Sequence, residues 1–540
     1  MKRLLRLGLL PAILFSPSLL LPQGSANLKV VAHVDPLPPS PNWKYSEVTG
    51  AGDLAILGGF QLPTSLVWIY DLSNKTAPQL LATIPFDSRS WDVQVHGRYL
   101  FIALSGRMEW YDILDPAQPK RVKRFEPNPP INPHTFFVAG NTLYVADLVS
   151  NGIRIFDIID KKNPKPLADI IDRSWSIHDM TVIRKRLYGA WIFGSAGLLV
   201  ADVKNPAAPK ELAKIRYPQA ATHNAWPTEN ERYILTTDEV APSRNNLKVW
   251  DARTPGRLTQ AAEREVNNAS SPIRNVYVRG HYAYASYYCE GLRVFDITDP
   301  TQPREVAFYD FNNNSTCAGF ASNWGVYPFA NLIYASDMND GLYVLEFADH
   351  PGANFIGAVI DADSNKPVRG AMVYFRDEYP TTRTNSAGGF DIPWFKNDTV
   401  NVVTEAPGYR PDMTTVLTSA VTKTTLTIRL KRFTTSVDQP KDIPAGFALL
   451  VSYPNPISAA ISTPTQIVFR LPVRAETQLE VYNIFGQHVR QLLRASREPG
   501  EHRFAWDGTD DAGQSVTAGV YILRLRAGQF SSSRRITVLR

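Results

Sequence analysis

The sequence has few cysteines, little excess charge and no long apolar run beyond its first residues. Its two cysteines, Cys289 and Cys317, allow one disulfide and exclude a scaffold held by several. The net charge is +6, and three basic residues lie in the first six positions, so the chain from residue 27 onward carries +3. This small, dispersed charge argues against nucleic-acid binding. No apolar run after residue 21 is long enough for a membrane span.

Motifs of the common catalytic chemistries are also absent. The chain has no Gly-x-Ser-x-Gly elbow, no His-Glu-x-x-His helix, no phosphate-binding loop and no Cys-x-x-Cys pair. These absences point to no cofactor and favour a non-enzymatic role. Catalysis stays open as an alternative, because sites assembled from distant single residues leave no local motif.

The composition favours strands and turns over helices. The chain contains 41 prolines, 32 glycines, 25 phenylalanines, 23 tyrosines and 11 tryptophans. Its 540 residues exceed what a single hydrophobic core supports, so several domains are expected. We therefore predict an all-β protein of several domains.

Residues 1–26 have the features of an export signal. A basic start is followed by the mostly apolar residues 7–21 and by the small residues Gly24, Ser25 and Ala26, which suit a cleavage site. Three prolines interrupt any helix long enough to pack or to span a bilayer. We expect cleavage after Ala26 and a secreted or cell-surface location in a bacterium of Gram-negative type.

One pattern returns every 41 to 50 residues along most of the chain. Each copy has an apolar strand, a turn, a second apolar strand ending in an acidic residue, and a Pro-containing turn. The acidic residues are Asp71, Asp112, Asp157, Asp202, Asp251, Asp296 and Glu346. Each copy has the content of a four-stranded blade, and blades stacked around an axis bury the faces that one blade leaves exposed. The pattern predicts a seven-bladed β-propeller over residues 27–349.

The seventh copy lacks an outer strand. It stops at Phe347, whereas the other copies continue past the Pro turn into a further strand. Residues 28–34 form an apolar strand at the other end of the repeat region. We predict that this strand completes the seventh blade and closes the ring, which removes exposed sheet edges.

The copies resemble the LVIVD-repeat family of bacterial extracellular β-propellers. The resemblance rests on segment pairs such as 143–147 with 152–157, and 282–286 with 291–300. It implies the propeller fold. It does not imply one function, because propellers serve as binding platforms, enzymes and scaffolds.

A different pattern occupies residues 350–433. Alternating apolar residues in 355–361 and 366–375, followed by the turn 385–390, predict a small sandwich of about seven strands. This region resembles the carboxypeptidase regulatory-like domain. The resemblance implies a transthyretin-like fold that has no catalytic groups of its own and often serves as a spacer.

Residues 434–444 read as a linker, and residues 445–540 form a further module. Its motifs resemble the C-terminal Ig-like module of type IX secretion cargo and of flagellar hook-capping proteins. They lie at 453–456, 481–487, 506–508, 510–513, 519–521 and in the basic end 534–540. The resemblance implies recognition by the outer-membrane secretion machinery, and a plain Ig-like spacer is the alternative.

Polar residues open the innermost strand of five copies. Strands in a blade alternate in direction, so these residues lie on one face, around the mouth of the central channel. The candidate ligand-binding residues are Asp92, His134, His178, Asp179, His223, Asn224, Arg274 and Asn275. Alternatively, these polar side chains bond to the backbone of neighbouring blades and hold the ring together.

The three histidines raise the question of a metal. Converging imidazoles beside Asp92 and Asp179 would suit a transition metal. Non-adjacent inner strands of a seven-membered ring stand too far apart to share one ion. The three histidines come from consecutive copies, but metal-to-nitrogen bonds of about 2.1 Å still demand close approach. We therefore expect weak or no metal binding, and a polar ligand held by hydrogen bonds instead.

Aromatic residues and the cysteines are expected on the same face as the histidines. Trp175, Trp226, Tyr287, Tyr288 and Trp324 could stack on a sugar or a peptide there, although most aromatic residues of a propeller are core. We predict a disulfide between Cys289 and Cys317, because adjacent blades can bring them together.

The sequence favours a secreted or cell-surface, non-enzymatic binding protein. Its propeller face would hold an unknown protein, glycan or small ligand, and its C-terminal module would serve export. One alternative is an extracellular hydrolase or lyase with its site at the channel mouth. Another is a structural surface-layer component.

Overall fold

The computed structural model describes residues 25–40, 42–61, 63–172, 176–193, 197–239, 246–266, 271–311, 317, 319–329, 331–349, 352–433, 447–449, 457–458 and 465–539. Within these ranges the chain forms strands and turns and no α-helix, which confirms the predicted all-β class. Accordingly, none of these residues forms a helix suited to crossing a bilayer. The predicted linker 434–444 and residues 1–24 of the predicted signal peptide lie outside these ranges.

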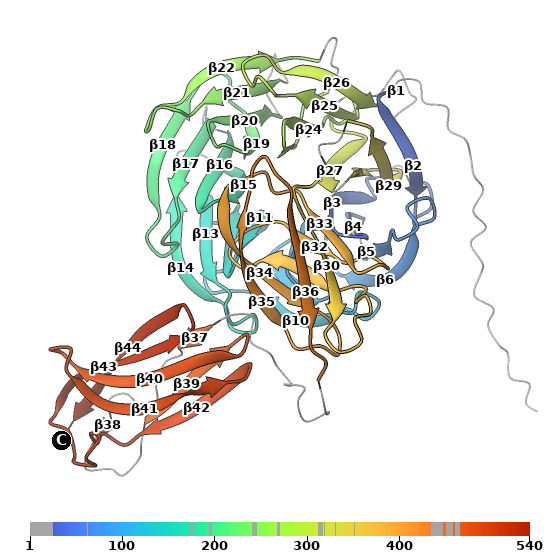
Figure 1. Ribbon diagram of the computed structural model, residues 1–540. Helices are drawn as coiled ribbons and strands as arrows, with labels where there is room; N and C mark the ends of the chain where they lie inside the picture. Colours follow the sequence, from blue (N-terminus) through green and yellow to red (C-terminus); the bar gives the residue numbers. More distant parts are fainter. Residues whose placement is uncertain are drawn as a thin grey trace, which may run out of the picture.

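Seven antiparallel sheets surround a central axis as the blades of a propeller (Figure 1). The first three blades are β3 (Tyr45–Ala51), β4 (Leu54–Gly59), β5 (Ser65–Asp71) and β6 (Gln79–Phe86); β7 (Ser90–His96), β8 (Tyr99–Leu104), β9 (Arg107–Asp112) and β10 (Lys120–Phe125); β11 (Pro133–Ala139), β12 (Thr142–Asp147), β13 (Gly152–Asp157) and β14 (Lys165–Ile171). The next two are β15 (Ser176–Ile183), β16 (Arg186–Phe193), β17 (Gly197–Asp202) and β18 (Lys210–Arg216); β19 (Thr222–Pro227), β20 (Tyr233–Asp238), β21 (Leu247–Asp251) and β22 (Thr259–Arg264). The sixth is β23 (Val276–Arg279), β24 (Tyr282–Ser286), β25 (Leu292–Asp296) and β26 (Arg304–Tyr309), and the seventh contains β27 (Asn323–Phe329), β28 (Leu332–Asp337) and β29 (Gly341–Phe347).

An N-terminal strand closes the ring. Strand β2 (Leu28–Val34) pairs antiparallel with β29, with Leu28 opposite Phe347 and Val34 opposite Leu342. This confirms the predicted completion of the seventh blade. The short strand β1 (Ser25–Ala26) pairs with β26 of the sixth blade. These two residues are the last of the predicted signal peptide, so cleavage after Ala26 would remove β1 and leave β2 intact.

Burial decreases from the axis outward within a blade. Strand β4 is buried at every position, because both its faces pack against neighbouring blades. The outermost strand β10 instead exposes Lys120, Arg121 and Arg124. This gradient explains why the second and third strands of each copy are continuous apolar runs in the sequence, whereas the fourth mixes apolar and charged residues.

The recurring aspartates end the third strand of the first six blades by capping a turn. The carboxylate of Asp157 accepts a hydrogen bond from the backbone N–H of Ile159, 2.8 Å away, and Asp71, Asp112, Asp202, Asp251 and Asp296 make the same bond two residues on. Asp is favoured in turns for this bond. Turn capping therefore explains why these aspartates recur.

A disulfide joins Cys289 and Cys317, whose Cα atoms are 5.7 Å apart. It links the turn after β24 to the segment that leads into β27. The bond therefore connects the sixth blade to the seventh.

A seven-stranded β-sandwich follows the propeller, and we call it the second sandwich because it is the second domain of the chain. One sheet has the order β33 (Gly389–Ile392), β30 (Phe355–Asp361) and β36 (Thr424–Leu430). The other has the order β32 (Thr381–Arg383), β31 (Met372–Phe375), β34 (Asp398–Glu405) and β35 (Asp412–Thr418). Its core contains Phe355, Val373, Phe375 and Trp394.

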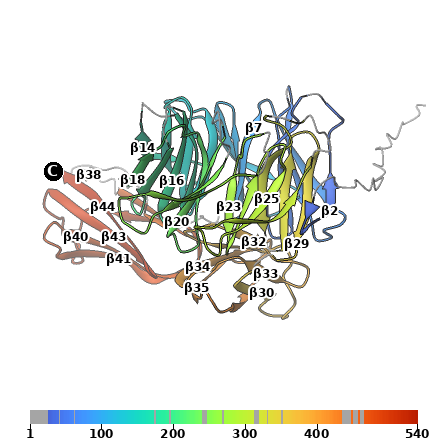
Figure 2. The same ribbon diagram turned by 90° about the horizontal axis from the view of Figure 1, so that it is seen from above.

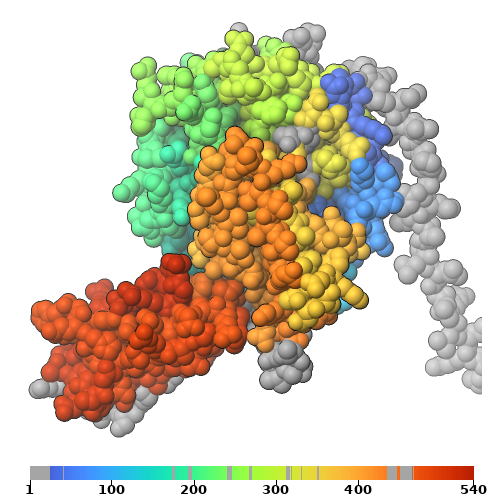
Figure 3. All heavy atoms as spheres, in the orientation of Figure 1, coloured from blue at the N-terminus to red at the C-terminus, as the bar shows by residue number. Residues whose placement is uncertain are grey.

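This second sandwich packs over one end of the propeller channel (Figures 1 and 3). The guanidinium of Arg383 pairs with Asp53 at 3.0 Å, and the backbone N–H of Gly97 donates to Thr381 Oγ1 at 2.9 Å. Gly52, in the β3–β4 turn, has a φ of +60°, and a Cβ there would lie 2.4 Å from the Arg383 carbonyl oxygen. Glycine is therefore required at this contact.

The last described module is a pair of sheets beside the propeller (Figure 2). One has the order β37 (Ala448–Leu449), β39 (Thr465–Leu471) and β42 (Gly500–Trp506). The other has the order β38 (Ile457–Ser458), β44 (Phe530–Leu539), β43 (Gly519–Ala527), β40 (Ala475–Asn483) and β41 (His488–Arg497). Arg470 of β39 pairs with Asp160 of the propeller at 2.9 Å. The motif residues 453–456 lie outside the described residues.

Candidate functional site

Irregular pairing turns neighbouring residues of the inner strands toward the channel. The pairing of β7 with β8 shifts register between Ser90 and Asp92, and that of β19 with β20 shifts between Thr222 and Asn224. Equivalent shifts occur in β3, β11, β15 and β27. A bulge sets two residues of one strand opposite one of its partner, which re-aims side chains. Adjacent candidate residues, such as His178 and Asp179, therefore both reach the axis, where His178 lies in a layer at the mouth and Asp179 in a layer deeper in the channel.

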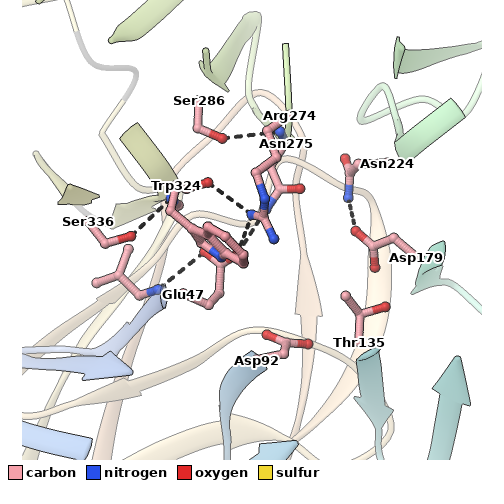
Figure 4. A network of polar contacts seen from close by, with 12 residues as sticks. Glu47, Asp92, Thr135, Asp179, Asn224, Arg274, Asn275, Ser286, Trp324 and Ser336 are labelled. Atoms are coloured by element: carbon pink, nitrogen blue, oxygen red, sulfur yellow. Dashed lines mark hydrogen bonds and ion pairs between the residues drawn. The ribbon is translucent and has the colours of Figure 1, made fainter. Parts of the chain in front are cut away.

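The inner layer, which we call the channel belt, links the blades to one another (Figure 4). It consists of Glu47, Asp92, Thr135, Asp179, Asn224 and Asn275. Asp92 Oδ2 accepts a hydrogen bond from the backbone N–H of Phe136 (3.1 Å), and Thr135 Oγ1 donates to the His178 carbonyl oxygen (2.8 Å). Asn224 makes two bonds: its Nδ2 donates to Asp179 Oδ2 (2.7 Å), and its Oδ1 accepts from the backbone N–H of Val276 (3.2 Å). Asn275 Nδ2 donates to Glu47 Oε2 (3.0 Å).

Four of these bonds join adjacent blades, and the bond from Asn275 to Glu47 joins the sixth blade to the first, past the seventh. Asp92, Asp179, Asn224 and Asn275 therefore link the blades and hold the ring together, as the alternative interpretation of the sequence had it. Buried polar groups that bond in this way avoid the cost of desolvation without a partner.

Arg274 is also engaged within the ring. Its Nη1 lies 3.0 Å from Glu47 Oε2 and 2.9 Å from the Trp324 carbonyl oxygen, and its guanidinium stacks over the Trp324 ring at 4.0 Å. Only 2% of Arg274 is exposed. The side chain therefore acts as an ion-paired element of the wall.

The channel carries more carboxyl groups than cations. Burial raises the pKa values of Glu47, Asp179 and Glu239, and burial together with Glu47 and Asp179 raises the pKa of Asp92 well above its ordinary value. Arg274 opposes this effect at Glu47. Buried carboxyl groups that repel one another favour a bound proton or a bound cation.

The channel is narrow below the belt and is closed at its far end. A cavity of about 40 Å³ lies between the belt and Tyr379, and it is lined by Thr181, Trp226 and Tyr277 among others. Tyr379, from the second sandwich, packs against Phe137 with ring centroids 5.6 Å apart. This volume holds a few waters and excludes an organic ligand. The channel interior between the belt and Tyr379 therefore has no room for an organic molecule.

The three predicted histidines converge at the mouth. His134 Nε2 and His178 Nε2 lie 2.9 Å apart, and the ring centroids of His178 and His223 are separated by 4.3 Å. One ring nitrogen from each residue lies within 4.8 Å of those of the other two. The close approach that a shared ion demands is therefore nearly met, because the imidazoles extend inward from three consecutive blades.

Burial keeps these imidazoles neutral. It lowers the pKa of His134 to about 3, with Arg274 adding to the effect, and it lowers those of His178 and His223 well below their ordinary value. His223 is 1% exposed, and neither of its ring nitrogens meets a hydrogen-bond partner among the described residues. A buried polar atom without a partner costs about 1–3 kcal/mol. The neutral His223 ring therefore has one nitrogen lone pair available to a further group.

A carboxylate faces the histidine cluster. Glu239 Oε2 lies 3.8 Å from His178 Nε2, and Glu239 Oε1 lies 3.6 Å from His223 Nε2. Tyr288 donates a hydrogen bond of 2.6 Å to Glu239 Oε1 and so orients the carboxylate. We call His134, His178, His223 and Glu239 the mouth cluster.

Three important residues were missed by sequence reasoning. Glu47 occupies the position in the first copy that corresponds to Asp92 in the second, so aligning the first copy would have found it. Glu239 follows β20 in a turn that has no counterpart motif, and Tyr379 comes from another domain. No sequence signal identified those two.

The aromatic residues mostly serve the core. Tyr287 is fully buried, Trp226 lies at the Tyr379 end of the channel, and Trp324 stacks under Arg274. Trp175 lies outside the described residues. Near the mouth, Trp43 and Phe320 are 40% and 43% exposed and pack beside Trp324 and Tyr288, respectively.

Comparison with solved structures finds propeller-like neighbours of low identity. The computationally designed Ika8 protein has 10% identity and a TM-score of 0.41, with 59% of this chain and 99% of that chain covered. A putative 6-phosphogluconolactonase from Bacteroides uniformis has 13% identity and a TM-score of 0.44, covering 52% and 88%. The N-terminal domain of Nup159 has 11% identity and a TM-score of 0.43, covering 59% and 95%. These likenesses carry no information about function.

Comparison with protein families identifies parts of two modules, whereas no curated protein matches the sequence. The LVIVD repeat matches residues 88–126 and 273–311, which correspond to the second and sixth blades. The FlgD Ig-like domain matches residues 455–529. The chain therefore contains LVIVD repeats in its propeller and an FlgD Ig-like domain after the second sandwich.

Proposed function

We propose that this protein is an exported, cell-surface binding protein whose propeller mouth holds a polar ligand. The observation that carries the proposal is the closure of one channel end by Tyr379 and the second sandwich. A ligand would then approach from the mouth, where the exposed aromatic rings of Trp43 and Phe320 accompany the buried histidine cluster. Exposed aromatic groups beside polar ones suit a glycan, a peptide or a small polar molecule.

The other modules support this role. We propose that residues 350–433 form a carboxypeptidase regulatory-like spacer and that residues 445–540 address the chain to the outer-membrane secretion machinery. The FlgD Ig-like match and the predicted signal peptide support export. Deleting residues 445–540 should leave a folded propeller inside the outer membrane. Normal surface delivery of the shortened chain would reduce the module to a spacer.

Ligand binding is tested with the purified full-length chain on glycan and metabolite arrays. A double variant, Trp43→Ala with Phe320→Ala, should weaken any hit by about tenfold, since each aromatic contact contributes roughly 0.5–1.5 kcal/mol. Val421→Ala is a matched control, because Val421 is 87% exposed on the second sandwich. Equal binding by the double variant and the control would place the ligand elsewhere.

The convergence of the histidines favours a second candidate, an extracellular hydrolase or lyase acting at the mouth. Turnover of an array hit by the wild-type chain, lost in His178→Ala, would select this candidate. Binding without turnover would select the platform.

A further inference from the structure

We propose that His134, His178 and His223 bind one transition-metal dication of the zinc class at the propeller mouth. This inference deepens the proposed function by naming what the mouth holds, and it rests on that function only in taking the mouth as the ligand-binding end. It also replaces the expectation of weak or no metal, which rested on the close approach that a shared ion demands and that the histidines nearly meet.

The geometry of the three nitrogens is close to that of a metal site. Zinc bonds imidazole nitrogens at about 2.0–2.1 Å, so two ligands of a tetrahedral ion lie about 3.4 Å apart. His134 Nε2 and His178 Nε2 are 2.9 Å apart, and all three ligand nitrogens lie within 4.8 Å of one another. Changes of up to about 1.4 Å in the distances between these nitrogens convert the cluster into a coordination shell.

The hydrogen bonding of the cluster is incomplete without a further group. His134 and His178 share one contact, and His223 has no partner for either ring nitrogen, although it is buried. A dication would engage a lone pair from each of the three rings. Imidazole is a preferred ligand of zinc, copper and nickel, whereas calcium and magnesium prefer oxygen.

Charge around the cluster also favours a cation. Glu239 faces His178 and His223 at 3.8 and 3.6 Å, and Tyr288 holds its carboxylate in place. Arg274, the cation of the channel wall, is neutralised by Glu47 at 3.0 Å. A dication at the mouth would therefore meet the carboxyl group of Glu239 beside two of its three ligands.

Three nitrogen ligands leave a coordination position open. In proteins, zinc with three protein ligands typically keeps its fourth position for water or for a ligand atom. Glu239, which faces His178 and His223, can take that position or bond to a group bound there. The metal would thus select ligands that present an anionic or strongly polar oxygen at the mouth.

Zinc alone is the probe that tests the site. The purified full-length chain, stripped with a chelator, should take up one equivalent of Zn²⁺ with submicromolar affinity in calorimetry. X-ray absorption should report imidazole nitrogens at about 2.0–2.1 Å. His178→Ala and His223→Ala should each weaken binding by about 100-fold or more, and Glu239→Gln by about ten- to 100-fold. His281→Ala, at an exposed histidine of the same propeller, should bind as the wild type does.

Folding is checked by circular dichroism, and Glu239→Gln keeps the test valid if a histidine variant unfolds, because it preserves the size of the side chain. Absence of stoichiometric zinc in the folded wild type would overturn the inference. So would wild-type affinity in a folded His178→Ala chain. Zinc binding without any organic ligand on the arrays would refute the proposed function and leave the metal site standing, so the two failures are distinguishable.

Discussion

Substitution of Leu28 by alanine should destabilise the propeller, because Leu28 anchors the closing strand. Leu28 is 7% exposed and packs with Tyr282, Tyr343 and Phe347 in the core between the sixth and seventh blades. Alanine lacks three of its carbon atoms, each worth about 0.8 kcal/mol when buried. The residual cavity adds to this loss, so the free energy of unfolding should fall by about 3 kcal/mol.

The measurement is chemical denaturation of the full-length chain followed by tryptophan fluorescence. Nine of the 11 tryptophans precede residue 350, so the signal reports mainly on the propeller. The matched control is Lys29→Ala, at the next residue of β2, whose side chain is exposed. It should change the free energy of unfolding by less than about 0.5 kcal/mol. Equal stabilities for the two variants would refute the packing argument.

A chain starting at residue 43 extends the same test. It lacks β2, so β29 would become an unpaired edge and the ring would be open. Its propeller should unfold at a lower denaturant concentration than that of the full chain. Indistinguishable unfolding would show that the N-terminal strand does not close the ring.

Three other contacts give measurable effects. Replacing Cys289 and Cys317 by serine should cost about 3 kcal/mol on the chain-entropy model for a separation of 28 residues, and two thiols alkylatable without reduction would remove the disulfide. Arg383→Met removes the partner of the half-buried Asp53 carboxylate and should lower the free energy of unfolding by about 1–3 kcal/mol; an unchanged value would contradict docking of the second sandwich through this pair. The pKa of His134 is lowered from 6.5 to about 3, so its contribution to stability is present above pH 6.5 and is lost as the pH falls toward 3. His134→Gln should reduce the pH dependence of stability in that window by up to about 1.4 kcal/mol per pH unit, and equal slopes in titrated denaturation would refute the assignment.

Local sequence patterns predicted the strands and turns of each blade, because neighbouring residues along the chain determine them. The repeat of apolar strands and turn-capping aspartates such as Asp157 specifies one blade at a time, because alternation and turn chemistry act over a few residues. The missing outer strand after Phe347 and the unassigned strand at residues 28–34 then predicted the closure, since a ring tolerates no unpaired edge. Strand direction also placed His134, His178 and His223 on one face.

Tertiary structure alone decided how those side chains are used. Whether inner-strand residues share a centre depends on the ring radius and on the register shift in each strand, which are set by the packing of all seven blades. Asp92 and Asp179 became links between blades, whereas the adjacent histidines became the mouth cluster with Glu239. Tyr379 closes the channel from a separate domain, and such a contact leaves no local pattern because its partners are distant in the chain. By itself, the sequence determined the architecture and the face; long-range packing decided the chemistry of the site.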